Sequence, residues 1–261
     1  MLKKYSSVLI TGATSGIGEE LAKKLASKSD KLLLTGRNKE KLQSLEKDLS
    51  QKTKIETKIS DLKEASSRKI ILDWIEIERP TLVINSAGFG LYGDALSHPI
   101  EESLDILKLD GEATLEITLK AANTLLKSGH PGTILNISSA AGFMVFPKFS
   151  VYAATKAFVT AFSQSLYYEL KDKGISVLTF CPGVVATNFR KRAAKGKETR
   201  KKMEIELGAA DTADAILKQI ENKKPLMIYD WKYRFLISLS QWLPISLKAK
   251  IMQKSIDDLI K

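Results

Sequence analysis

The sequence has one cysteine and two histidines among its 261 residues, and these low counts argue against a disulfide within the chain and against a metal site. A single cysteine, Cys181, cannot form a disulfide within the chain, and it cannot supply the paired thiolates of a zinc site. His98 and His130 each precede a proline, and neither has a second ligand at metal-binding spacing. We therefore expect no metal site, a buried Cys181, and a reducing compartment such as the cytoplasm.

Long hydrophobic runs are also missing. No stretch reaches the roughly 18 apolar residues of a membrane-spanning helix, because the nearest candidate, residues 235–247, contains polar residues and Pro244. The first residues show no signal-peptide pattern, since their short apolar run leads directly into a glycine-rich turn. Hydrophobic residues make up 44% and charged residues 27% of the chain, which is ordinary for a globular protein in solution.

Acidic residues are the minority charge, with 30 Asp and Glu against 41 Lys and Arg and a net charge of +11. The excess is concentrated in residues 190–202, where the sequence reads RKRAAKGKETRKK. Such a run fits an anionic substrate or a membrane surface, or it is a solvated helix face. Nucleic acid is the weakest candidate, because the chain has no recognition motif and no aromatic residue interrupts the basic run.

Short apolar runs alternate with longer amphipathic segments along most of the chain. Six short runs end in Gly, Asn, Ser or Pro and predict buried strands at 7–11, 31–35, 55–59, 82–85, 133–138 and 175–181. The run 226–228 predicts a seventh strand. The longer segments have helical spacing and predict helices at 17–26, 39–49, 62–78, 100–127, 151–173 and 211–222. We predict an α/β fold: one Rossmann-type, doubly wound parallel sheet of about seven strands with helices on both faces. This domain spans residues 1–230, and a helical C-terminal extension follows at 231–261.

The first predicted strand leads into the turn TGATSGIG, residues 11–18. Its three glycines allow a tight turn and a close approach of backbone N–H groups to a pyrophosphate. The N-terminus of the following helix adds unpaired donors and a partial positive charge. A plain strand–helix turn is the alternative, but the position between the first strand and the first helix predicts a dinucleotide site. The expected cofactor contacts in this turn are Gly12, Thr14, Ser15, Gly16, Ile17 and Gly18.

The end of the second predicted strand indicates which nicotinamide cofactor is bound. An NAD-selective site places Asp or Glu there to accept a hydrogen bond from the ribose 2′-OH. Here Gly36 is followed by Arg37, whose guanidinium can pair with a 2′-phosphate that a carboxylate would repel. Arg37 therefore favours NADP(H), against the alternative of a solvated surface arginine.

Tyr152 and Lys156 are four residues apart near the start of a predicted helix, so their side chains share one face. A phenol with a pKa near 10 is a poor base at pH 7, but a nearby ammonium and a cationic nicotinamide would lower that pKa. Ser139 follows the strand 133–138, and its hydroxyl can hold a substrate oxygen beside the phenol. This set predicts hydride transfer between a nicotinamide and a carbonyl or alcohol carbon, with Tyr152 donating the proton in reduction.

Together these motifs resemble those of the short-chain dehydrogenase/reductase family. The resemblance extends from residue 7 to residue 228 and includes TGATSGIG, the Asp61–Leu62 pair, NSAG, NISSAAG, YAATK and CPGVVAT in the order of the family. It implies that Ser139, Tyr152 and Lys156 are catalytic and that Tyr152 and Lys156 also contact the cofactor. The further cofactor contacts that it implies are Asp61, Leu62, Asn85, Ala87, Gly88, Pro182, Gly183, Val185 and Thr187.

Two positions depart from the pattern of the family. Ser86 replaces an asparagine, and we expect a minor effect because serine also forms hydrogen bonds. Asp110 lies on the long middle helix where the family commonly has an asparagine that supports a water beside the catalytic lysine. A carboxylate there can pair with Lys156, so we count Asp110 among the catalytic residues and expect an altered pH profile rather than inactivity.

The resemblance also implies a substrate class and a lid. Residues 188–210 correspond to the substrate lid of the family, and the segment NSAGFGLYG and the C-terminal tail resemble the branch with long-chain 3-ketoacyl reductases and related bacterial oxidoreductases. This implies a carbonyl or alcohol substrate such as a 3-oxoacyl thioester or another hydrophobic ketone. The alternative is an NADP-binding regulator or scaffold with little turnover, although such a protein would not need Ser139, Tyr152 and Lys156.

The extension 231–261 mixes aromatic with basic residues. It can cover the core or the substrate pocket, form a subunit contact, or lie peripherally on an anionic membrane. We expect a homodimer through the long helices or a homotetramer.

Overall fold

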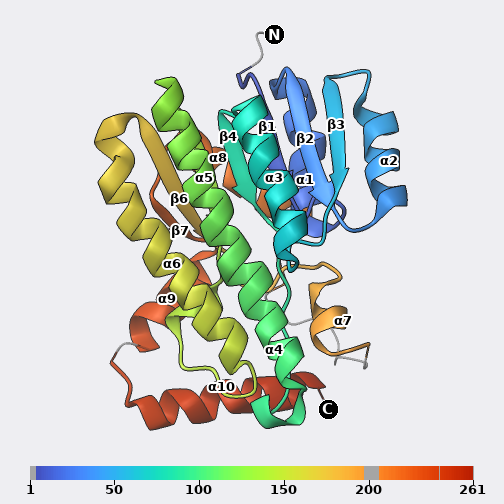
Figure 1. Cartoon of the computed structure of the whole chain (residues 1–261). Helices are drawn as coiled ribbons and strands as arrows, with labels where there is room; N and C mark the ends of the chain where they lie inside the picture. Colours follow the sequence, from blue (N-terminus) through green and yellow to red (C-terminus); the bar gives the residue numbers. More distant parts are fainter. Residues whose placement is uncertain (1–3, 197–205, 241, 261) are drawn as a thin grey trace.

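The computed structural model describes residues 4–196, 206–240 and 242–260. Its centre is a seven-stranded sheet in the order β3-β2-β1-β4-β5-β6-β7, and every neighbouring pair is parallel (Figure 1). The strands are β1 (Val8–Thr11), β2 (Lys31–Gly36), β3 (Lys54–Ile59), β4 (Leu82–Asn85), β5 (Gly132–Ile137), β6 (Ile175–Cys181) and β7 (Leu226–Ile228). The predicted doubly wound α/β fold is confirmed.

Helices cover both faces of this sheet. The helices α3 (Ala65–Glu78), α5 (Ala113–Ser128) and α6 (Ser150–Leu170) contribute to one buried cluster. The helices α1 (Gly16–Leu25), α2 (Lys39–Leu49) and α8 (Ala209–Glu221) contribute to a second cluster on the opposite face. A short helix, α7 (Phe189–Ala193), follows β6.

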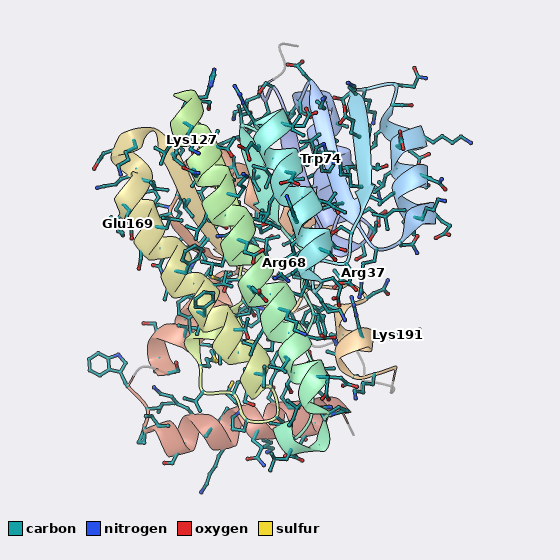
Figure 2. The ribbon with its side chains drawn as sticks, viewed as in Figure 1. Arg37, Arg68, Trp74, Lys127, Glu169 and Lys191 are labelled. Carbon is teal, nitrogen blue, oxygen red and sulfur yellow. The ribbon has the colours of Figure 1, made fainter. Side chains whose placement is uncertain are left out.

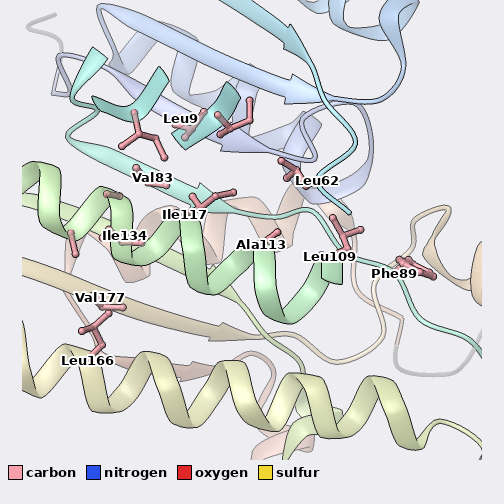
Figure 3. Packing of buried hydrophobic residues seen from close by; sticks show 14 of the residues in the cluster. Leu9, Leu62, Val83, Phe89, Leu109, Ala113, Ile117, Ile134, Leu166 and Val177 are labelled. Atoms are coloured by element: carbon pink, nitrogen blue, oxygen red, sulfur yellow. The ribbon is translucent and has the colours of Figure 1, made fainter. Parts of the chain in front are cut away.

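The central strands β1, β4 and β6 are buried along their whole length because both faces of the sheet are covered there. The edge strand β3 is only partly buried and carries Lys, Glu and Thr, so the expectation of a buried strand at 55–59 is correct for the strand but wrong for its burial. Successive side chains point to opposite faces, so β1 contributes Leu9 to the first cluster and Val8 and Ile10 to the second. Figure 3 shows members of the first cluster from neighbouring strands and from α5 and α6, among them Leu9, Val83, Ile117, Ile134, Leu166 and Val177.

The long middle helix departs from the sequence expectation in its geometry. The predicted helix 100–127 is present, but α4 (Ile100–Ile106) continues into α5 through a π-helical segment, Leu107–Glu112. Single π-helical turns inside α-helices are frequent at functional sites, and this one carries Asp110.

The C-terminal extension forms two helices, α9 (Trp231–Ser240) and α10 (Ile245–Ile260). Ile256 and Leu259 of α10 belong to the same buried cluster as α5 and α6, and Asp257 forms an ion pair with Lys148, just before α6. In Figure 1 α10 runs along the lower edge of the molecule, below the carboxyl ends of the strands. In the described part of the chain, no helix has the length and apolar character needed to cross a bilayer.

A buried network of polar side chains fixes α5 and α6 on the sheet. The side-chain oxygen of Asn136 accepts hydrogen bonds from Asn85 (2.8 Å) and from Thr118 of α5 (3.0 Å). Its amide nitrogen donates to Ser163 of α6 (2.8 Å). All four side chains are buried, so each depends on the others for its hydrogen bonds.

Replacement of Asn136 by alanine should lower the free energy of unfolding by about 2–4 kcal/mol, because it leaves buried partners unsatisfied. Asn123→Ala on the exposed side of α5 is the matched control, and it should change stability by less than about 0.5 kcal/mol. Urea denaturation of both variants measures the difference. Equal losses would contradict a structural role for the network.

Candidate active site

A cavity of about 440 Å³ opens at the carboxyl ends of the strands. The strand order reverses direction between β1 and β4, and ligands of open parallel sheets bind at such a point. Figure 2 shows Arg37 at the lower end of the sheet and Lys191 of α7 below it. The predicted site residues that line the cavity are Gly12, Thr14, Ser15, Gly16, Ile17, Arg37, Asp61, Leu62, Ala87, Gly88, Ser139, Tyr152, Lys156, Pro182, Gly183, Val185 and Thr187.

The remaining predicted site residues, Gly18, Asn85 and Asp110, lie behind the cavity wall. A Cβ atom on Gly18 would lie 2.4 Å from the carbonyl oxygen of Gly12, so glycine permits α1 to pack closely on the turn. Asn85 directs its amide into the buried network of Asn136. These positions therefore support the lining residues from behind.

The N-terminus of α1 provides donors at one end of the cavity. Ser15 is its N-cap residue, but no side chain caps the first turn with a hydrogen bond. Ser15 and Gly16 line the cavity, so this end of the helix faces the open space. Uncapped backbone N–H groups at a helix N-terminus attract an anion, and this arrangement fits the pyrophosphate of a dinucleotide.

Arg37 lies directly after β2, at the same end of the cavity. Its guanidinium Nη1 is 3.7 Å from the Oδ2 atom of Asp61, and 44% of the Arg37 side chain is exposed. Asp61 also accepts a hydrogen bond from the backbone N–H of Lys63 (3.2 Å). Asp61 therefore positions Arg37 at the rim of the cavity while much of the guanidinium stays accessible.

The predicted catalytic side chains meet at the other end of the cavity. Tyr152 and Lys156 occupy successive turns at the start of α6, and Ser139 follows β5. Lys156 donates a hydrogen bond to the carbonyl oxygen of Ile137 (3.0 Å), and its Nζ atom lies 5.6 Å from the centre of the Tyr152 ring. The Ser139 hydroxyl is near enough to Tyr152 to lower the pKa of its phenol. The three predicted residues therefore lie together at this end of the cavity.

The surroundings of Ser139 orient its hydroxyl group. Its Oγ atom accepts a hydrogen bond from the backbone N–H of Ala141 (3.1 Å) and caps a short 3₁₀ turn, Ala140–Phe143. This bond occupies an acceptor site of the hydroxyl and leaves its proton for another partner.

Tyr152 is held in an apolar environment. Its ring stacks on Phe149 with the ring centres 4.4 Å apart, and Phe189 lies 5.4 Å away on another side. Burial raises the pKa of Tyr152 above its ordinary value, the nearby Asp110 carboxylate raises it further, and the neighbouring Ser139 hydroxyl opposes both effects. In this environment the phenol retains its proton.

Asp110 is fully buried beside Lys156. Its Oδ2 atom is 3.3 Å from the Lys156 Nζ atom, and its Oδ1 atom accepts a hydrogen bond from the backbone N–H of Phe89 (3.0 Å). Burial raises the pKa of Asp110, while the Lys156 charge and the Phe89 N–H oppose this shift. The expected pairing of Asp110 with Lys156 is therefore present.

Sequence reasoning left open whether the C-terminal extension covers the substrate pocket, and it named none of the residues that form this part of the wall. Tyr233 of α9 packs so closely on Gly183 that a Cβ there would lie 1.9 Å from the ring. The Tyr233 hydroxyl accepts a hydrogen bond from the backbone N–H of Val184 (3.0 Å). Leu236, Met252, Ser255, Ile256 and Leu259 also line the cavity. Their apolar spacing predicted helices but not which surface those helices cover.

The expected lid, residues 188–210, is described only in part, because residues 197–205 lie outside the described residues. Arg190 of α7 lines the cavity and forms an ion pair with Glu206 (3.1 Å). Arg192 also lines the cavity, and its guanidinium lies 5.2 Å from the centre of the Phe89 ring. The basic run therefore begins at the cavity itself.

The lone cysteine is buried, as expected. Cys181 has no exposed surface, and burial raises the pKa of its thiol to about 12. The described residues include no cluster of three or more His, Cys, Asp or Glu side chains that could hold a metal ion.

Comparison with known proteins agrees with this geometry. The sequence pattern of the short chain dehydrogenase family matches residues 6–198. An uncharacterized oxidoreductase of Staphylococcus aureus is 34% identical over 223 residues, which cover 83% of this chain and 91% of that protein. Sulfoacetaldehyde reductase 2 of Chromohalobacter salexigens is 31% identical over 185 residues, which cover 70% of this chain and 73% of that protein. A solved short-chain dehydrogenase from Sphingobium yanoikuyae in complex with NADPH superposes with a TM-score of 0.79 at 28% identity, covering 90% of this chain and 94% of that one. The chain therefore belongs to the short-chain dehydrogenase family of oxidoreductases.

Proposed function

We propose that the protein is an NADP(H)-dependent oxidoreductase that interconverts a carbonyl and an alcohol on a substrate with a large apolar part. One observation carries this proposal. One cavity is lined at one end by the uncapped N-terminus of α1 and Arg37, and at the other end by Ser139, Tyr152 and Lys156.

In this proposal the glycine turn and the N-terminus of α1 hold the pyrophosphate, and Asp61 and Leu62 hold the adenine. Arg37 pairs with the 2′-phosphate, which supports NADP(H) over NAD(H). When bound, the nicotinamide accepts or supplies the hydride. Lys156 would contact its ribose, and Pro182, Gly183, Val185 and Thr187 would line the nicotinamide end.

The protein's own side chains would handle the proton. Ser139 donates a hydrogen bond to the substrate oxygen and places that oxygen beside the Tyr152 hydroxyl. In reduction Tyr152 donates its proton to this oxygen, and in oxidation it accepts the proton from the alcohol. Lys156, fixed by the carbonyl oxygen of Ile137 and by Asp110, stabilises the phenolate when it forms.

The cavity wall supports a hydrophobic carbonyl substrate. Phe146 and Phe149 face the cavity from the segment before α6, and Met252 and Ile256 face it from α10. A pocket of this character favours a bulky ketone or a 3-oxoacyl chain over a small polar aldehyde. Arg190 and Arg192 at the lid suit a substrate whose remote end is anionic, such as an acyl thioester.

A homo-oligomer through the long helices is also proposed. Leu107, Leu119, Leu126 and Phe158 are apolar side chains of this helical layer, and each is more than 40% exposed. Apolar side chains exposed together on one layer mark an interface more often than a free surface.

Arg37→Ala should weaken NADPH binding by roughly 10- to 100-fold, because it removes a charge-assisted contact to the 2′-phosphate. NADH binding should change little. Fluorescence titration of both cofactors gives the two dissociation constants, and Lys47→Ala on the exposed side of α2 is the control. Equal losses for NADPH and NADH would refute the assignment.

Tyr152→Phe should reduce turnover by about 10²- to 10⁴-fold, because the phenylalanine ring cannot transfer a proton. NADPH affinity should stay close to that of the wild type. Tyr168→Phe, on the exposed side of the same helix, is the matched control. The assay uses a panel of hydrophobic ketones and 3-oxoacyl thioesters. A wild-type protein that binds NADPH tightly but turns over none of them would favour the regulator or scaffold.

Asp110→Asn should move the pH profile of alcohol oxidation toward lower pH. The carboxylate raises the pKa of Tyr152, so its removal lowers that pKa. Oxidation needs the phenolate and rises with pH, and the variant should therefore reach half of its maximal kcat/KM at a lower pH. Asp105→Asn, which removes a carboxylate paired with Lys63, is the control. Superimposable curves for the wild type and Asp110→Asn would exclude a role for this charge.

A further inference from the structure

The C-terminal extension leaves an apolar and basic area uncovered. We call it the tail surface and define it as the exposed side chains of residues 231–240 and 242–254. Trp242, between α9 and α10, is 87% exposed, and Ile245 at the start of α10 is 67% exposed. Large apolar side chains that gather on one surface mark a contact with a partner or a membrane.

The apolar stripe of α9 points outward. Trp231, Phe235 and Leu239 are spaced four residues apart, so they lie on one face of the helix. Trp231 is 64% and Phe235 61% exposed, while Ile237 on the other face is buried. An amphipathic helix packed on a protein core normally turns its apolar stripe inward, and α9 instead presents a second apolar face to the outside.

On α10 apolar and basic side chains share the outer face. Leu247 and Ile251 are exposed and four residues apart, beside Lys250 and Lys254, which are also exposed and four residues apart. The inner face of the same helix carries Ile256, which is buried. The outer face of α10 thus extends the tail surface from α9.

The charge of this segment is entirely positive. Residues 231–256 contain Lys and Arg at five positions and no Asp or Glu. The described residues provide no salt bridge to any of these cations: Lys232, Arg234, Lys248, Lys250 and Lys254. A partner of this surface must therefore combine an apolar phase with negative charge.

We propose that the tail surface docks the protein onto an anionic lipid membrane. Tryptophan and other apolar side chains insert between lipids at the interface, while neighbouring lysines and arginines attract anionic headgroups. Nucleic acid lacks the apolar phase that Phe235 and Leu239 require. A second copy of the chain would bring two uncompensated positive surfaces together, which costs free energy.

The tail surface adjoins the cavity. Leu236 of α9 and Met252 of α10 line the cavity, so the two helices separate it from the docked membrane. If the proposed function is correct, this position suits a carbonyl substrate whose apolar part dissolves in the bilayer. The docking itself does not depend on that function.

Co-sedimentation tests the docking with vesicles of phosphatidylcholine and with vesicles that also contain phosphatidylglycerol. The wild type should bind the mixed vesicles more tightly, and salt should weaken this binding. The variant K250Q/K254Q should bind roughly 25-fold more weakly, since each basic side chain near an anionic surface contributes about fivefold. The control K127Q/K173Q removes two exposed lysines from outside the tail surface, and it should bind like the wild type.

Tryptophan emission gives an independent readout. Of the three tryptophans, Trp74 is buried, whereas Trp231 and Trp242 lie on the tail surface. Mixed vesicles should shift the emission of the wild type to shorter wavelengths, because an indole that enters the interface leaves water. The variant W231F/W242F retains Trp74 alone and should show no shift.

Three outcomes would overturn the docking proposal. The first is equal binding of the wild type to both kinds of vesicle, and the second is binding of K250Q/K254Q at the wild-type level. The third is a wild type that binds no vesicles and forms an oligomer, which the substitution Phe235→Ser dissociates. The last result would assign the surface to a second copy. NADPH binding, thermal melting and turnover of a water-soluble ketone should be unchanged in K250Q/K254Q. These controls separate a failure of docking from a failure of the proposed function or of folding.

Discussion

The site depends on the burial of one positive charge. Lys156 has almost no exposed surface, and its ammonium is compensated by the Asp110 carboxylate and the carbonyl oxygen of Ile137. A buried ion of this kind is tolerated only when its partners are well placed, because an uncompensated charge in the interior destabilises the fold by several kcal/mol. The end of β5, the start of α6 and the π-helical segment must therefore hold fixed relative positions. The same contacts that compensate the Lys156 side chain also keep it beside Tyr152.

Much of the fold follows from local patterns. Short apolar runs, six of which end in glycine, asparagine, serine or proline, correctly predicted the strands of the sheet, and the order of elements implied its doubly wound form. Boundaries were less accurate: the helix predicted from Leu62 begins at Ala65. The π-helical geometry around Asp110 could not be anticipated, because the hydrogen-bonding pattern of a helix depends on its packing and not on its apolar spacing.

The candidate site likewise has features that the sequence predicts and features that it does not. The pairing of Asp110 with Lys156 was predictable because the family resemblance aligns Asp110 with an asparagine beside the catalytic lysine. The contact between Tyr233 and Gly183 was not, since Tyr233 lies beyond residue 228, where the family motifs end. Asn85 illustrates a third case. It belongs to a recognisable motif, yet its side chain serves the buried network rather than the cavity wall.

The lone thiol has a practical consequence. Cys181 is fully enclosed, and burial raises the pKa of its thiol to about 12, so very little reactive thiolate exists at neutral pH. For alkylating dyes and spin labels, the native protein behaves as a cysteine-free background. A cysteine introduced at any exposed position would be the sole site of attachment while the fold is intact. Distances and motions within this molecule are therefore accessible to site-specific labelling without removing a native residue first.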